Sequence, residues 1–98
     1  MFYTFCQSNP GGRYDETMPM YVIIQAVSAE DANKKAESVG VYFDGIAQGI
    51  DCSCCNDRWY RVEESDGTDT AQVYEQDAID DGEKTKIYYF TPLEKAML

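Results

Sequence analysis

Residues 20–40 constrain the fold of this chain most, because they combine the pattern of a buried strand with that of a capped helix. Residues 21–27 are mostly β-branched, aromatic or aliphatic, which is typical of a strand inside a sheet. Ser28 follows at the N-cap position, and Asp31 three residues later gives the spacing of a capping box. Gly40 suits the left-handed residue just beyond the end of a helix. The sequence therefore predicts a strand that leads directly into a helix.

The predicted helix, residues 29–39, has a narrow face of small apolar side chains that allows close packing on a sheet. This face consists of Ala29, Ala32, Ala36 and Val39. Further strands are predicted at residues 2–6, 58–62, 71–74 and 84–90, and residues 41–43 begin another apolar run. The 98 residues are expected to form one domain, 1–98. We expect an α+β fold in which an antiparallel sheet of four to six strands carries this one helix on one face.

The charge of the chain limits the classes of partner that it can bind. The net charge is −10 and the pI is about 4.1, so nucleic acid and anionic membranes would repel the protein. No apolar run approaches membrane-spanning length, and the N-terminal residues do not follow the pattern of a signal peptide. We therefore expect a cytoplasmic protein that contacts neither membrane nor nucleic acid directly. Its natural complement is a protein with a basic surface.

The chain contains no histidine, which excludes a histidine general base, an imidazole metal ligand and a simple histidine pH switch. Carboxylates are abundant, but none stands beside a nucleophile motif or a lysine in an apolar run. We therefore expect no enzymatic activity and no catalytic residue.

Four cysteines suggest a second class of function. Cys52 and Cys55 form a Cys-x-x-Cys pair with Cys54 between them, which is half of the ligand pattern of a zinc ribbon. The second pair is missing, and only Cys6 remains as a fourth thiol. A small structural zinc module with these four ligands is the alternative to a binding protein. Small buried thiols without a cofactor are the favoured interpretation.

Residues 63–83 contain nine acids and no lysine or arginine, so nearly all of the net charge lies in this segment. Solvated hairpin loops would explain such a run without any function. The functional interpretation is a negative surface that docks on a basic groove, as a phosphate backbone does. The residues predicted to form this surface are Glu63, Glu64, Asp66, Asp69, Tyr74, Glu75, Asp77, Asp80, Asp81 and Glu83.

A third, less favoured class is a nucleotide-binding protein. Arg58 and Arg61 flank an aromatic pair that begins with Trp59, a pattern that can combine base stacking with phosphate pairing. In a chain this acidic, pairing of the two arginines with Asp51 or Asp57 is the favoured interpretation.

Three blocks of sequence carry a family resemblance: FYTFCQ followed by a Gly-Gly loop, then SAEDANKKAESVGVYFDG, then DCSCCNDRW. In this order they resemble a family of small uncharacterised proteins from tailed bacteriophages. The resemblance covers about residues 1–62 and fades in the acidic half. It implies no reaction, substrate or catalytic residue, but it does imply a setting, because small phage proteins act mostly by binding inside the host cell.

The charge pattern and the resemblance together predict a small acidic binding protein that acts in the cytoplasm of the host cell. We expect it to inhibit or modulate a host protein, such as a defence or nucleic-acid-binding complex. The expected mechanism is nucleic-acid mimicry by the negative surface.

Overall fold

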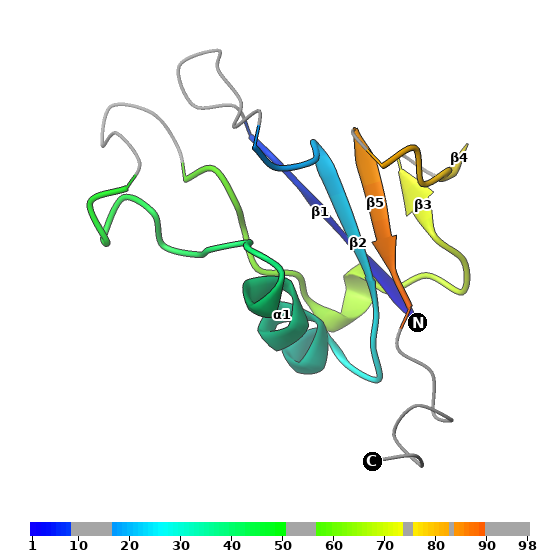
Figure 1. The fold of residues 1–98 in the computed structure, drawn as a ribbon. Coiled ribbons are helices and arrows are strands. Elements are labelled where there is room, and N and C mark those ends of the chain that lie inside the picture. The colour runs from blue at the N-terminus through cyan, green and yellow to red at the C-terminus, as the bar shows by residue number, and fades with distance from the viewer. Residues whose placement is uncertain (9–16, 51–56, 74–75, 83, 90–98) are drawn as a thin grey trace.

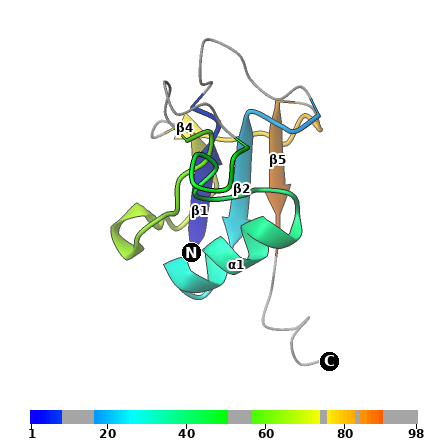
Figure 2. The same ribbon diagram turned by 90° about the vertical axis from the view of Figure 1, so that its left-hand side faces the viewer.

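The computed structural model describes residues 1–8, 17–50, 57–73, 76–82 and 84–89 (Figure 1). Three strands form the main sheet in the order β1-β2-β5, and two short strands form a separate ribbon, β3-β4. Helix α1 covers one face of the main sheet and the ribbon lies on the other, as Figures 1 and 2 show from two directions. The elements are β1 (Phe2–Cys6), β2 (Tyr21–Gln25), α1 (Ala29–Ser38), the 3₁₀ helix η2 (Glu64–Asp66), β3 (Gln72–Val73), β4 (Gln76–Asp77) and β5 (Thr85–Tyr88).

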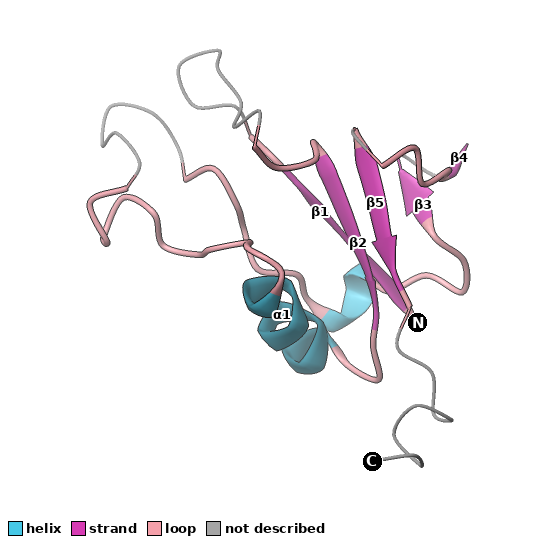
Figure 3. Cartoon of the chain, in the orientation of Figure 1, coloured by secondary structure: helices cyan, strands magenta, loops and turns pink. Residues whose placement is uncertain are grey.

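The strand directions differ from the predicted sheet, although the α+β class is confirmed (Figure 3). β1 pairs antiparallel with β2, placing Phe5 opposite Val22. β2 pairs parallel with β5, placing Ile23 opposite Ile87. The expectation of one purely antiparallel sheet of four to six strands is therefore wrong for the described residues. Residues 26–84 separate β2 from β5, so no short hairpin fixes an antiparallel direction for this pair.

β2 is the central strand, as its composition predicted. Val22, Ile23 and Ile24 are fully buried, because both faces of the strand are covered. On the α1 face, the rings of Tyr3 and Phe5 pack with β2 against the helix. The helix contributes the small residues Ala29, Ala32 and Ala36, all of them buried, with Val39 partly buried beside them. The predicted apolar helix face is therefore confirmed.

The predicted N-cap of α1 is confirmed, but the Asp31 carboxylate bonds the amide one residue before Ser28, where a capping box would bond Ser28 itself. The Ser28 hydroxyl accepts a hydrogen bond from the Asp31 amide at 3.1 Å, and the Asp31 carboxylate accepts one from the Val27 amide at 3.2 Å. The helix ends at Ser38, one residue before the predicted end. Gly40 has a φ of 109°, a conformation that a residue with a side chain rarely adopts.

Two segments predicted as extended structure are not strands. Residues 41–43 and 58–62 belong to no strand, yet Val41, Phe43 and Trp59 are buried in the core. The backbone of Val62 bonds the side chain of helix residue Asn33, so this segment is held to α1 instead of joining the sheet. Among the described residues, no helix has the length and apolar character needed to cross a membrane.

Candidate functional site

The structure describes seven of the nine acids predicted to form the docking surface, and all seven are exposed. Three of them lie on or next to η2, close to the start of α1: Glu63, Glu64 and Asp66. The other four lie around the β3-β4 ribbon and the turn before β5: Asp69, Asp77, Asp80 and Asp81. Tyr74, Glu75 and Glu83 lie outside the described residues.

Glu64 ties η2 to the beginning of α1. One carboxylate oxygen accepts a hydrogen bond from the Ala29 amide at 2.8 Å, and the other accepts from the Tyr3 hydroxyl at 3.2 Å. An anion at a helix N-terminus is favourable because the free amide groups and the helix dipole point toward it. Burial, and then the neighbouring Glu64 carboxylate, raises the pKa of the Tyr3 hydroxyl. Glu64 therefore has a role in the fold.

Asp66 is the last residue of η2. The Asp66 carboxylate accepts a hydrogen bond from the Glu63 amide at 2.7 Å, which closes the short 3₁₀ turn at its start. The sequence could not predict this 3₁₀ turn, because the hydrogen bond that positions it reaches across to α1.

Asp80 and Asp81 shape the turn that leads into β5. The Asp80 carboxylate accepts hydrogen bonds from the amides of Gly82 and Ile87 at 2.9 and 3.0 Å, and it lies 3.6 Å from the ammonium of Lys86. The Ile87 amide is the main cause of the lowered pKa of Asp80. The Asp81 carboxylate accepts from the Lys84 amide at 2.7 Å. Such bonds from aspartate to nearby amides are common in turns, so this role has a sequence signal.

Glu63, Asp69 and Asp77 have fewer ties to the fold: the Glu63 side chain takes part in the capping box of η2, and the Asp77 carboxylate accepts a hydrogen bond of 3.5 Å from the Thr70 hydroxyl. Within the described part of the chain, none of the three forms an ion pair. Basic side chains pair with other acids: Lys34 with Glu30, Lys35 with Asp31, Arg61 with Asp44 and Lys86 with Asp80. The negative charge of the three acids is therefore not balanced by these basic groups.

The zinc alternative is left as a prediction. Cys6 is half-buried, and its thiol donates to the Gln7 carbonyl at 3.4 Å. Cys52, Cys54 and Cys55 lie outside the described residues, so their distances to Cys6 are not defined. Among the residues that are described, no three cysteines or acids are grouped in a way that could hold a metal ion.

The nucleotide-binding alternative is wrong for its central residue. Trp59 is 1% exposed and lies in the core, so its ring cannot stack on a base. Arg61 forms a two-point ion pair with Asp44, with a shortest distance of 2.8 Å, and this hydrogen bonding is the main cause of the lowered pKa of Asp44. Arg58 donates to the Gln7 side chain at 3.0 Å. The prediction that Arg61 pairs with an acid is therefore confirmed, but the acid is Asp44 and not Asp51 or Asp57.

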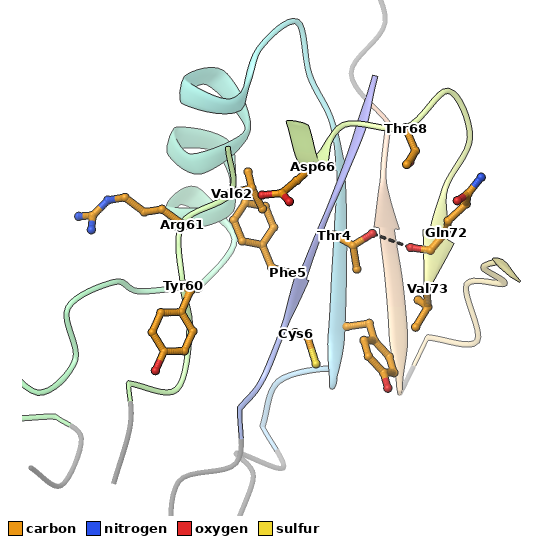
Figure 4. Close-up of a pocket in the computed structure, with 11 residues that line it drawn as sticks. Thr4, Phe5, Cys6, Tyr60, Arg61, Val62, Asp66, Thr68, Gln72 and Val73 are labelled. Carbon is orange, nitrogen blue, oxygen red and sulfur yellow. Dashed lines mark hydrogen bonds between the residues drawn. The ribbon is translucent and has the colours of Figure 1, made fainter. Parts of the chain in front are cut away.

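A cleft of about 440 Å³ runs beside β1, and sequence reasoning missed it (Figure 4). Its lining comes from β1, from the first residue of β2, from the segment that follows Trp59, from η2 and from β3. These segments are far apart in sequence, and only the edge position of β1 could have indicated an opening. The lining residues are Thr4, Phe5, Cys6, Tyr21, Tyr60, Arg61, Val62, Asp66, Thr68, Gln72 and Val73.

Comparisons with known proteins identify the family of this chain. No curated protein and no solved structure matches this chain. One family model matches residues 1–96, nearly the whole sequence. The chain therefore belongs to the family described as a domain of unknown function (DUF7296).

Proposed function

We propose that this protein acts by binding, without catalysis, and that it docks on the basic surface of another protein through its acidic side chains. The observation that carries this proposal is the unbalanced charge of Glu63, Asp69 and Asp77, which are exposed and have no described ionic partner. Leaving like charges unpaired costs the folded state some stability, and a cationic partner would recover that cost.

Some of these acids also support the fold. Glu64, Asp80 and Asp81 accept hydrogen bonds from backbone amides and support the fold. Their charges still add to the field around the protein, but their removal would change folding together with binding. Asp69 and Asp77 are therefore the sharper probes of docking.

The proposed setting is the cytoplasm of a bacterial host, in line with the resemblance to small proteins of tailed bacteriophages. There the protein would inhibit or modulate a host protein that normally holds nucleic acid, including a defence complex. Exposed carboxylates spaced along a surface can occupy a groove that is built for phosphates.

The experiment uses the purified protein as immobilised bait in bacterial lysate, followed by association kinetics with the retained protein. Asp69→Asn combined with Asp77→Asn should slow association and leave dissociation almost unchanged. Salt should weaken binding, because the Debye length falls from about 10 Å at 0.1 M to about 3 Å at 1 M.

A matched control removes two negative charges from α1 instead. Glu30→Gln combined with Glu37→Gln changes the net charge equally, at exposed positions on the opposite side of the sheet. This control should keep most of the association rate at low salt. Equal rates for the parent and the Asp69/Asp77 variant would contradict the proposal.

A further inference from the structure

β1 lies at the edge of the main sheet. Its hydrogen bonds to β2 show which of its backbone groups point away from the sheet. The Gln7 amide donates to the Met20 carbonyl at 3.0 Å, and the Ala26 amide donates to the Met1 carbonyl at 2.9 Å. In an antiparallel pair, residues that bond the neighbouring strand alternate with residues whose backbone groups point away from it. The odd-numbered residues of β1 therefore face β2, and the backbone N–H and C=O of Thr4 lie on the outer edge.

This outer edge is covered at its two ends. Phe2 exchanges two backbone hydrogen bonds with Thr68, at 2.7 and 2.9 Å. At the other end, the Ser8 amide donates to the Arg58 carbonyl at 2.8 Å. A strand paired along this whole edge would need six residue steps to pass from Phe2 to Ser8. The segment from 58 to 68 contains more residues than that. The extra residues leave the edge, and within the described residues no strand pairs with β1 between the two ends.

Two ties to α1 hold the departing segment on the helix side of β1, off its outer backbone edge. The amide of Val62 donates to the Asn33 side chain at 2.9 Å, and the Asn33 side chain donates back to the Val62 carbonyl at 3.2 Å. Glu64 caps the helix through the Ala29 amide. The opening beside Thr4 is therefore fixed by specific bonds on the helix side.

The cleft described above lies along this open edge (Figure 4). Tyr60 lines it on one side of β1 and Val73 on the other in Figure 4, so its walls offer aromatic and apolar surface to side chains. The Thr4 hydroxyl donates to the Gln72 carbonyl at 2.6 Å, which holds β3 close to the edge strand.

The charge around the cleft favours a basic occupant. Arg61 is the one cation in its lining; its guanidinium points away from β1 in Figure 4 and is neutralised by Asp44. Asp66 lies at one end of the cleft and has no ionic partner among the described residues. A second copy of this chain would bring another net charge of −10 to the same place, so the charge opposes self-pairing.

We propose that the open edge of β1 at Thr4 binds an extended, basic segment of a partner protein as an added strand. The backbone of the segment bonds the N–H and C=O of Thr4, and its alternate side chains contact the cleft walls. About three residues, at about 3.3 Å each, span the edge around Thr4, from Tyr3 to Phe5. This strand pairing goes beyond docking by surface charge. It rests on the proposed function for one feature only, the basic character of the bound segment.

The test uses a fluorescently labelled six-residue peptide of alternating lysine and valine, with fluorescence anisotropy as the readout. Its control is the same peptide with methyl groups on all of its backbone nitrogens, which keeps the side-chain charge but removes the N–H donors from both edges of the strand. We expect the control to bind at least about tenfold more weakly, the factor that corresponds to ~1.4 kcal/mol. Hydrogen exchange of the Thr4 amide should slow when the unmethylated peptide binds.

Two variants at Thr4 separate the backbone from the side chain. Thr4→Pro removes the outward N–H and leaves the bonds to β2, since proline is compatible with the outer side of an edge strand. Thr4→Val keeps that N–H and removes only the hydroxyl. The proline variant should weaken peptide binding about tenfold, whereas the valine variant should change it less than about threefold. Denaturation curves establish whether both variants fold. Hydrogen exchange of the Thr4 amide is measured in the parent protein, so it tests the proposal even if a variant does not fold.

Equal affinity for the two peptides would overturn the strand proposal while leaving docking by surface charge intact. An unchanged exchange rate of the Thr4 amide under saturating peptide would also overturn it. A dimer in sedimentation experiments, with Thr4 protected only at high protein concentration, would assign the edge to a second copy and overturn the proposal as well.

Discussion

Replacing Glu64 with alanine should destabilise the protein, although this residue is exposed and lies in a segment that reads as a solvated acidic loop. Its carboxylate is an acceptor for the Ala29 amide at 2.8 Å and for the Tyr3 hydroxyl at 3.2 Å. Alanine removes both acceptors, and Tyr3 is only 1% exposed, so water does not easily replace the lost bond.

The magnitude follows from these contacts. An unsatisfied buried polar group costs about 1–3 kcal/mol, and a charge at a helix N-terminus contributes about 0.3–1 kcal/mol. Because Glu64 is exposed and these contributions overlap, we expect Glu64→Ala to lower the free energy of unfolding by about 2 kcal/mol. For a domain of this size, that change lowers Tm by about 8–16 °C. Glu64→Gln keeps an oxygen acceptor and should lose about half as much.

Urea denaturation followed by circular dichroism measures the effect, provided that the m-value is unchanged. Asp69→Ala is the matched control, since it removes an exposed acid of the same segment that has no described ion pair. Its stability should stay within about 0.5 kcal/mol of the parent. If Glu64→Ala and Asp69→Ala have the same midpoint, Glu64 does not cap α1 in solution, and the reasoning is refuted.

Three further changes test the fold. Ser28→Ala should cost about 1 kcal/mol by removing the cap, and an unchanged denaturation midpoint would contradict it. The pKa of Asp80 is lowered in the folded protein, so its ionised carboxylate stabilises the fold at pH values above the unfolded pKa of about 3.9. This contribution to stability is lost as the pH falls through the lower pKa of the folded state. Asp80→Asn should therefore be less stable at pH 7 and converge with the parent in acid unfolding curves. Gly67→Ala places a Cβ 3.1 Å from the Tyr3 ring, and this crowding should lower the free energy of unfolding by about 1 kcal/mol. A rise in Tm would refute the crowding.

The parts of the fold that could be predicted have local signals. The Ser28 cap and the buried composition of β2 depend on neighbouring residues, and both are confirmed. The turn before β5 also has a local cause, because Asp80 and Asp81 bond amides only a few residues away. Such features follow from short-range chemistry that the order of residues displays directly.

The parts that could not be predicted depend on contacts between distant residues. Val62 reads as part of a strand, but its backbone bonds Asn33, which lies 29 positions earlier. Glu64 reads as part of a solvated loop, but it caps a helix that begins 35 positions earlier. The cleft beside β1 arises from both of these bonds, so no local pattern could reveal it.

The acidic composition and the open edge of β1 explain each other in physical terms. An unpaired strand edge is a hazard, because it can pair with a second copy of the same chain and start aggregation. Natural proteins commonly protect such edges with charge, and here Asp66 lies in the cleft while the whole chain carries −10. Like charge repels another copy, whereas a basic segment is attracted by the same field. In the proposed complex, the charge that opposes pairing with a second copy is also the charge that attracts the basic segment to the edge of β1.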